Sequence, residues 1–387
     1  MPRLDVDIDY LAEQLRGLLK IPSPTGFTDT ITHAVVDELV RLGVEPEVTR
    51  RGAIRAKLKG RVKDPSRALI AHLDTLGAQV KLLKPNGRLE IVPIGNWSAR
   101  FAEGARVTIF TEQGAYRGSI LPLKASGHTF NDEVDSQPTG WRHVEVRVDA
   151  LVRDVHDLQR LGFHVGDVVA IDTQAEFLEN GFIVSRHLDD KAGVAILLAA
   201  LKAVVESGEK PPVDTWFVLS IAEEVGVGAA AVLPHDVAAM VTIDNGTTAP
   251  GQASDEFGVT IAMADQTGPF DYHLTHELIR LARENDIRHQ RDVFRYYRSD
   301  SASAIEAGAD VRTALATFGV DASHGYERIH MHALRSLAEL MTAWVTSGIE
   351  IKRDAKPLGT IEGFPHQPTA PAEPDIEPSE ELPARND

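Results

Sequence analysis

Histidine and carboxylate side chains recur in this sequence at the points where apolar, strand-like runs end. Such runs are typical of buried strands, and ligands in open α/β sheets bind beyond the carboxyl ends of the strands. The runs and the residues after them are Ala68–Ala71 before His72, Trp216–Ile221 before Glu223 and Glu224, Met240–Ile243 before Asp244, and Val311–Phe318 before His324. A further candidate, Asp189, directly precedes an apolar helical run. We expect these side chains to gather at one edge of a sheet.

The residue types in this set suit a pair of divalent metal ions. The chain has no cysteine, so imidazole and carboxylate groups must hold any metal. Two ions about 3.5–4 Å apart need a bridging carboxylate and a few terminal ligands each. Two histidines and three carboxylates supply that set, which favours zinc, cobalt or manganese. Glu223 would remain free as a general base, and Asp74 would fix the tautomer of His72 by accepting a hydrogen bond from it.

Each signal has a structural alternative when it is taken singly. A lone histidine after a strand is more often a satisfied polar residue than a ligand. Paired glutamates such as Glu223 and Glu224 are common at the start of a solvated helix, where carboxylates are favoured. Asp189 and Asp190 could cap the helix that follows them. The joint occurrence of these residues in this order favours the metal site.

Asp300 is a candidate for binding the substrate. It follows the basic, aromatic run RYYRS and precedes a predicted helix. One interpretation is a helix N-cap. The other is a carboxylate that helps to place the α-amino group of a peptide near the metals.

The late histidine has three candidates within nine residues, namely His324, His330 and His332. His324 follows the predicted strand after the short loop Gly319–Ser323, which puts it at the sheet edge. The run Tyr326–Leu334 is typical of the start of a helix, on which His330 and His332 would point about 200° apart. We therefore assign the ligand to His324.

The elements that must position these residues alternate between helix and strand. Leucine spacing predicts a helix over residues 7–20, a second helix covers 29–42, and the run from Asp190 to Ser207 predicts a third. Between about residues 77 and 166 the pattern changes to short β-like runs separated by Gly, Pro and Asn turns. The sequence thus predicts an α/β protein, with a mixed sheet flanked by helices and an inserted β-rich domain. The expected domains are a catalytic domain of residues 1–76 and 167–352, an insert of residues 77–166, and a tail of residues 353–387.

Composition narrows the possible partners and location. The 387 residues carry a formal net charge of -17, which disfavours nucleic acid and anionic membrane surfaces. The amino-terminal residues lack the pattern of a secretory signal and no run is long enough to span a membrane, so we expect a cytoplasmic protein. Seven of the 21 prolines lie between Pro357 and Pro383 among acidic residues, which predicts a disordered tail.

A set of short motifs resembles the M42 metallo-aminopeptidases, a branch of the di-metal peptidase clan. The resemblance covers roughly residues 7–348, and its motifs are AHLDTLG, HLDDKAGVA, SIAEEVGVGAA, TIDN, RSDSASA and SHGYERIH. It implies His72 and Asp244 at one metal, Glu224 and His324 at the other, Asp189 as the bridge and Glu223 as the base. Thr75 and Leu76 depart from the family pattern after HxD, and the late histidine stands in SHGYER rather than in an RYxHSP-like run.

The resemblance also implies an activity and an assembly. It implies a metal-dependent aminopeptidase with two divalent ions per subunit, zinc or cobalt, acting on short peptides. It further implies a homo-oligomer, from a dimer up to a dodecamer, assembled through the insert. Two alternatives stay open: a deacylase or amidase on an N-acylated dipeptide, and a non-enzymatic assembly protein. The first arises because the SHGYER form is similar to a subgroup associated with the osmoprotectant N-acetylglutaminylglutamine amide.

Overall fold

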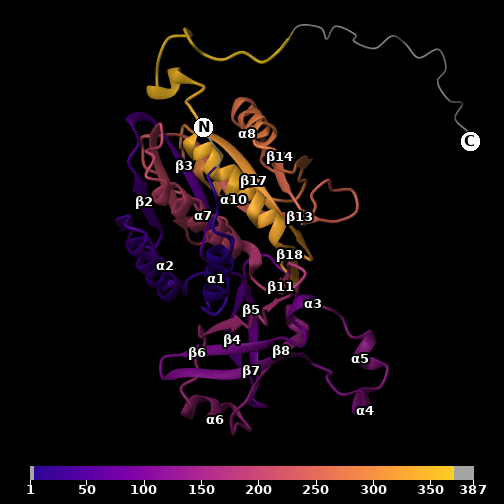
Figure 1. Ribbon diagram of the computed structural model, residues 1–387. Coiled ribbons are helices and arrows are strands. Elements are labelled where there is room, and N and C mark those ends of the chain that lie inside the picture. The colour runs from indigo at the N-terminus through magenta and orange to yellow at the C-terminus, as the bar shows by residue number, and fades with distance from the viewer. Residues whose placement is uncertain (1–3, 370–387) are drawn as a thin grey trace, which may run out of the picture.

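A twelve-stranded mixed sheet flanked by helices forms the larger part of the protein, and a closed β-barrel forms the smaller part (Figure 1). The computed structural model describes residues 4–369. The expected α/β class with an inserted β-rich domain is confirmed. The strands of the main sheet are β1 (Pro46–Val48), β2 (Ile54–Leu58), β3 (Val62–His72), β10 (Glu176–Phe177), β11 (Phe182–Ser185), β12 (Val213–Ser220), β13 (Val237–Thr248), β14 (Val259–Asp265), β15 (Gly268–Pro269), β16 (His289–Val293), β17 (Arg312–Asp321) and β18 (Glu327–His330).

Four parallel strands, in the order β12-β3-β13-β17, form the centre of this sheet. Every residue of β12 is buried, because helices cover both faces of the sheet and a continuous apolar run can be satisfied only there. The register pairs His72 with Ser220 and Asp244 with Thr317. The carboxyl ends of the four strands therefore lie at the same edge of the sheet.

The helices cover the sheet as Figure 1 shows. They are α1 (Ile8–Leu18), α2 (Asp29–Arg41), α7 (Leu188–Ser207), α8 (Tyr272–Glu284), α9 (Asp300–Glu306) and α10 (Met331–Thr346). Helix α7 is buried along most of its length and packs against α1, α10, β3 and β13, which explains why it is apolar on all sides. Among residues 4–369, no helix is long and apolar enough to cross a lipid bilayer.

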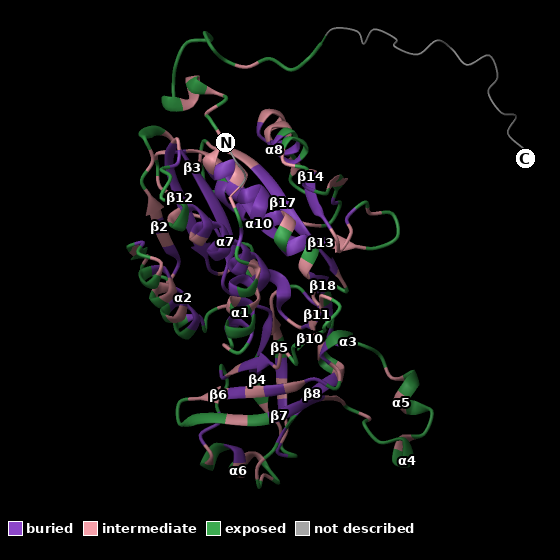
Figure 2. Ribbon diagram, in the orientation of Figure 1, coloured by how far each residue is buried: buried purple, intermediate pink, exposed green. Residues whose placement is uncertain are grey.

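The inserted domain is a closed six-stranded barrel in the order β4-β5-β8-β7-β6-β9. Closure leaves no unpaired sheet edge, and the interior holds a separate apolar cluster that includes Leu89, Ile109 and Val146. A long excursion between β7 and β8 is exposed and extends away from the barrel (Figure 2). The elements are β4 (Gly77–Leu83), β5 (Leu89–Ile94), α3 (Ala99–Ala102), β6 (Arg106–Thr111), β7 (Gly114–Pro122), α4 (Gly127–Phe130), α5 (Glu133–Ser136), η1 (Trp141–His143), β8 (Val144–Val148), α6 (Val155–Arg160) and β9 (Val168–Ile171).

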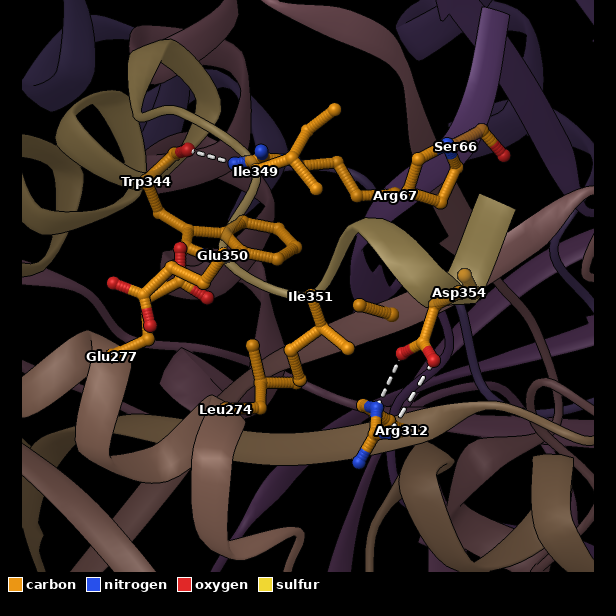
Figure 3. Close-up of a pocket in the computed structure, with 13 residues that line it drawn as sticks. Ser66, Arg67, Leu274, Glu277, Arg312, Trp344, Ile349, Glu350, Ile351 and Asp354 are labelled. Carbon is orange, nitrogen blue, oxygen red and sulfur yellow. Dashed lines mark hydrogen bonds and ion pairs between the residues drawn. The ribbon is translucent and has the colours of Figure 1, made fainter. Parts of the chain in front are cut away.

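At the amino ends of β3, β13 and β17, a cavity of about 50 Å³ lies beside the guanidinium of Arg67 (Figure 3). Arg67 is buried and donates to the carbonyl of Trp344, to the hydroxyl of Ser347 at 3.1 Å and to its carbonyl at 3.2 Å. The Ser347 hydroxyl in turn donates to Glu277 at 3.2 Å. The buried charge at this edge is therefore surrounded by hydrogen-bond partners.

The described part of the tail runs past the same edge. The short helix η3 (Lys352–Ala355) places Asp354 against Arg312, whose Nε donates to the carboxylate at 2.5 Å. The Arg312 guanidinium also lies over the ring of Phe364, 5.9 Å from its centroid. Disorder was expected for residues 353–387, and residues 370–387 of that range lie outside the described residues.

Candidate metal centre and active site

The candidate ligands lie together at the carboxyl edge of the parallel strands. His72 is the last residue of β3, and Asp244 lies in β13. Glu223 and Glu224 begin η2 (Glu223–Val225), three residues after β12 ends. Asp189 lies at the start of α7, where its backbone dihedral angles are not helical. Strand ends and a helix start thus converge at one point, as expected for an α/β sheet.

The carboxylate of Asp189 lies between two imidazole rings. Its Oδ1 is 3.1 Å from Nε2 of His72, and its Oδ2 is 3.2 Å from Nε2 of His324. The side-chain amide of Asn245 donates to Oδ2 at 2.6 Å. Asp189 is buried, so the carboxylate is held in this orientation by these groups rather than by solvent. One oxygen toward each histidine is the arrangement that a bridging ligand between two ions requires.

Each of the two glutamates lies near one of the two histidines. Glu223 Oε2 is 3.9 Å from Nε2 of His72, whereas Glu224 Oε2 is 3.7 Å from Nε2 of His324. Glu224 Oε1 is buried and makes no hydrogen bond to any group of residues 4–369. The side chain of Glu224 is 4% exposed and that of Glu223 is 15% exposed, so Glu223 is the more accessible of the pair.

Asp74 holds His72 and the backbone of Glu223 and Glu224 by hydrogen bonds. Nδ1 of His72 lies 2.9 Å from the main-chain carbonyl of Asp74, which leaves Nε2 to face the site. The Asp74 carboxylate accepts the backbone N–H groups of Glu223 at 3.1 Å and Glu224 at 3.4 Å, and the hydroxyl of Thr25 at 2.5 Å. The carboxylate is 3.6 Å from Nδ1, so the carbonyl rather than the carboxylate is the nearer acceptor for the ring.

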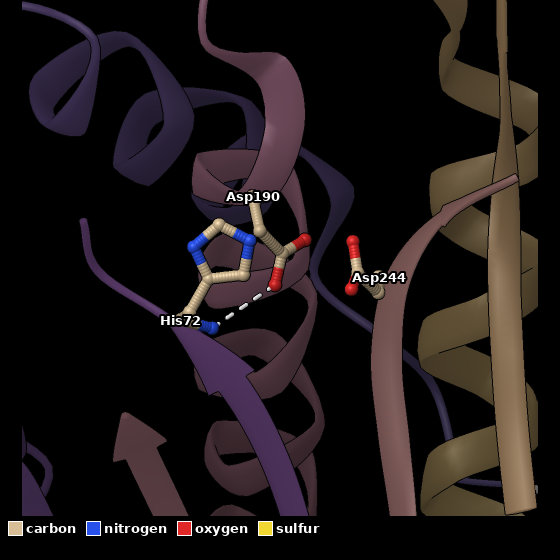
Figure 4. Close-up of side chains that lie close together, drawn as sticks. All are labelled: His72, Asp190 and Asp244. Atoms are coloured by element: carbon tan, nitrogen blue, oxygen red, sulfur yellow. Dashed lines mark hydrogen bonds between the residues drawn. The ribbon is translucent and has the colours of Figure 1, made fainter. Parts of the chain in front are cut away.

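His72, Asp190 and Asp244 form a second convergent group, whose possible ligand atoms lie within 4.8 Å of one another (Figure 4). Asp190 is also engaged with the backbone: Oδ2 accepts from the N–H of His72 at 3.1 Å, and Oδ1 accepts from the N–H of Gly193 at 3.2 Å. The bond to Gly193 resembles a helix cap. The capping interpretation of the Asp189–Asp190 pair therefore fits Asp190, while Asp189 faces the histidines.

Burial and crowding control the protonation of the cluster. Burial, followed by the charge of Asp189, raises the pKa of Asp244 to about 7 and the pKa of Glu224 well above its ordinary value. Burial also raises the pKa of Glu223. Burial opposes charge on His324, but the hydrogen bond to Asp189 and the charge of Glu224 outweigh it and raise its pKa to about 11. A buried excess of carboxylates of this kind is stabilised by cations.

The donor set fits divalent metal ions. The candidate ligand atoms are carboxylate oxygens or imidazole nitrogens, and one of them, Glu224 Oε1, is buried without a hydrogen-bond partner in the described part of the chain. Two groups that could hold an ion share His72: one adds Asp190 and Asp244, and the other adds Asp189 and Glu224. Harder metals with nitrogen and oxygen preferences match such a set.

The other two late histidines lie away from the cluster. Nε2 of His330 lies 3.0 Å from the carbonyl of Asn180, and its ring packs edge-on against Phe182 at 4.8 Å. His332 lies in α10, and the ring centroids of His330 and His332 are 4.4 Å apart.

The expected helix start at Tyr326 is wrong, because Glu327–His330 is strand β18, which pairs with β11, and α10 begins only at Met331. Strand β17 also extends beyond the expected end, to Asp321, which shortens the loop before His324.

Asp300 is the first residue of α9, and the capping position belongs to Ser299. Its side chain is buried, Oδ2 accepts from the hydroxyl of Ser220 at 2.7 Å, and Oδ1 has no hydrogen-bond partner among residues 4–369. A Cβ on Gly228 would lie only 2.0 Å from Oδ1, so this glycine is required for the close approach. Burial raises the pKa of Asp300 to about 6.

Sequence reasoning missed two groups that hold His324. The buried Glu327 accepts its backbone N–H at 3.0 Å, and the carbonyl of Asn96, from the inserted domain, lies 2.9 Å from its Nδ1. Burial, followed by the charge of Asp189, raises the pKa of Glu327 to about 8. Glu327 stands three residues after His324 in the quoted motif, which was a usable signal. The contact with Asn96 could not be predicted, because every residue has a backbone carbonyl and the residue type does not indicate which one acts as an acceptor.

The fold and the site together define the class of the protein. A sheet with helices on both faces, carrying histidines and carboxylates at its carboxyl edge, is compatible with a metal-dependent hydrolase. The sequence matches the family model described as M42 glutamyl aminopeptidase over residues 52–340. The chain belongs to this family, and it is therefore a hydrolase that acts on peptide bonds.

Individual relatives agree with this assignment. The Bacillus subtilis protein named "Putative aminopeptidase YhfE" is 38% identical over 336 residues, which span 87% of this chain and 97% of the relative. The glutamyl aminopeptidase of Lactococcus lactis is 24% identical over 228 residues, or 57% of this chain and 62% of the relative.

Solved structures show the same fold. The TET aminopeptidase from Thaumarchaeota archaeon SCGC AB-539-E09 superposes with a TM-score of 0.80 at 19% identity, covering 87% of this chain and 96% of that one. The Pyrococcus horikoshii TET1 peptidase superposes with a TM-score of 0.77 at 21% identity, covering 87% and 99%.

Proposed function

We propose that this protein removes amino-terminal residues from short peptides with a pair of divalent metal ions, zinc or cobalt. The observation that carries the proposal is the Asp189 carboxylate, which offers one oxygen toward His72 and the other toward His324. We assign one ion to His72 and Asp244 and the other to Glu224 and His324, with Asp189 shared. When bound, such ions polarise the scissile carbonyl and lower the pKa of a water molecule.

The remaining residues then act on protons and on orientation. Glu223, which is more exposed than Glu224 and lies near His72, accepts the proton of the attacking water and delivers it to the leaving amine. Asp74 holds the Glu223–Glu224 turn through two backbone N–H groups and keeps Nε2 of His72 directed into the site. Asn245 orients Asp189 through its side-chain amide.

The test combines metal analysis with one substitution. Purified protein should bind about two ions per subunit and hydrolyse aminoacyl chromogenic substrates, but not their N-acetylated forms. Glu223→Gln should retain both ions and the fold while kcat falls by about 10²–10⁴-fold. Loss of metal from Glu223→Gln, with little loss from Glu224→Gln, would reverse the two roles. Turnover of N-acetylated substrates in preference to free amines would replace the aminopeptidase with a deacylase.

We further propose that residues 77–166 mediate assembly of the catalytic domain (residues 1–76 and 167–352) into a homo-oligomer. The Pyrococcus horikoshii TET1 peptidase assembles into a tetrahedron or a large octahedral shell. In this chain the insert has its own apolar core and an exposed excursion, so it can present a surface without disturbing the sheet. Light scattering on the full chain should give a mass well above 42.2 kDa, and a monomer would contradict the proposal.

A further inference from the structure

Glu327 connects the two chain segments that carry Asp189 and His324. Its Oε2 accepts the backbone N–H of Leu188 at 2.7 Å and that of Asp189 at 3.2 Å. Its Oε1 accepts the backbone N–H of His324 at 3.0 Å. One buried carboxylate thus contacts the start of α7 and the loop after β17, which lie about 140 residues apart in the sequence.

These three N–H groups have no regular secondary-structure partner. The first N–H groups of a helix have no hydrogen-bond acceptor within the helix. His187, at the capping position of α7, makes no side-chain cap within the described residues. His324 has a φ of 63°, in the left-handed region, and therefore lies outside any ladder. Glu327 supplies the missing acceptors because β18 pairs with β11 and leaves alternate side chains, Glu327 and Ile329, buried.

We infer that Glu327 is a positioning residue that fixes the separation of Asp189 and His324 and so holds the metal subsite formed by Asp189, Glu224 and His324. This inference rests on the proposed function. The side chains of Asp189 and His324 lie 3.2 Å apart, and they belong to the same two backbone segments that Glu327 holds. A carboxylate is needed because three donors approach from two directions, one direction for each oxygen. A glutamine offers one acceptor oxygen, and an aspartate is shorter by one methylene.

The matched control is Glu277, a half-buried carboxyl at the opposite edge of the sheet. Burial raises its pKa as it does that of Glu327, and it also accepts a hydrogen bond, from Ser347. Glu277→Gln makes the same chemical change as Glu327→Gln, far from the metal cluster. It therefore reports what the loss of a hydrogen-bonded carboxylate does to the fold alone.

The experiment titrates Co²⁺ into metal-free wild type, Glu327→Gln and Glu277→Gln by calorimetry, and records the melting temperature of each metal-free protein. In Glu327→Gln one ion should bind about 10–100-fold more weakly, with a smaller change for the other ion and a changed visible spectrum of bound Co²⁺. Glu277→Gln should bind both ions as wild type does. Glu327→Asp, which keeps the charge, should show the same selective loss, and it replaces the glutamine variant if that one does not fold.

The outcomes separate the two hypotheses. If wild type binds two ions and both Glu327 variants bind them equally well, Glu327 is only a structural cap and the inference is overturned. The same holds if the melting temperature falls in the Glu327 variants while the affinities do not change. If wild type binds a single ion, the two-ion centre is refuted, and the effect of Glu327 on that ion still decides the positioning role.

Discussion

The two ends of the same parallel strands differ in how their buried charges are compensated. At the amino ends, Arg67 is surrounded by carbonyl and hydroxyl acceptors and lies near Glu277. At the carboxyl ends, Asp189, Asp190, Asp244, Glu223 and Glu224 crowd around two histidines, and one carboxylate oxygen has no partner in the described residues. The Arg67 charge is compensated by these acceptors and by nearby carboxylates, which stabilises the fold, whereas the crowded carboxylates at the other end need cations to become stable. Compensation of the buried charge therefore separates the structural edge from the chemical one.

The largest effect that this comparison predicts follows the removal of the shared carboxylate. Asp189→Asn should abolish turnover and lower the affinity of both ions. The amide has only one oxygen that can bind an ion, so it cannot be shared between the ion beside His72 and the ion beside His324. Elemental analysis after dialysis measures this. Glu277→Gln, at the other edge, should keep both ions. Two ions per subunit in Asp189→Asn would break the comparison.

Replacing the late histidine should affect one side of the cluster only. His324→Ala removes the imidazole that faces both Asp189 and Glu224, so one ion should be lost together with turnover. His332→Ala should leave metal content and turnover near wild type, because His332 lies in α10 and its ring packs on His330. Metal content and activity of the two variants side by side provide the check. A metal-depleted His332→Ala protein would contradict the assignment.

Substitution at the opposite edge should change stability without changing chemistry. Arg67→Met leaves the carbonyls of Trp344 and Ser347 without their donor, and the free energy of unfolding should fall by about 3 kcal/mol. Urea denaturation measures the loss. Metal stoichiometry and kcat should stay near wild type at temperatures where the variant is folded. A change in metal content at unchanged stability would mean that the two edges are coupled.

The metal-free protein should lose stability as the pH rises. The pKa of Asp244 is raised to about 7, that of Glu327 to about 8 and that of His324 to about 11, all above their ordinary values. The folded state therefore binds more protons than the unfolded chain between about pH 5 and about pH 9, and stability falls across that window. The melting temperature of chelator-treated protein should drop accordingly, and Asp244→Asn should flatten the slope. A rising melting temperature would show that other groups dominate.

The smallest expected effect concerns substrate entry. We propose that Asp300 favours the α-amino group of the substrate through its charge, although its side chain is buried against Ser220. Asp300→Asn should raise KM for free-amine peptides by about threefold, equivalent to ~0.6 kcal/mol, and leave unchanged the inhibition constant of N-acetylated peptides, measured as competitive inhibitors. Steady-state kinetics on both classes decide this. An equal change in both classes would limit Asp300 to holding Ser220 and α9.

Sequence patterns predicted those parts of the site that depend on local structure. His72 and Asp244 could be recognised because a buried strand precedes each of them and parallel strands end at one edge. The role of Glu327 could not be predicted in this way, because it depends on β18 pairing with β11, a contact between segments far apart in the sequence. The same pairing explains the error at Tyr326, where a four-residue strand directly before a helix has too few residues to show its own period.

The contact between Asn96 and His324 affects how this enzyme can be simplified. The main-chain carbonyl that accepts the hydrogen bond from Nδ1 of His324 comes from the turn after β5. Trp97 fixes that turn by donating to the carbonyl of Gly77 at 3.1 Å. A minimal enzyme made by deleting the barrel and joining its ends would keep every proposed metal ligand. It would still lose the acceptor that selects the correct tautomer of one imidazole. The barrel is therefore part of the catalytic unit, and a smaller version must supply a replacement acceptor.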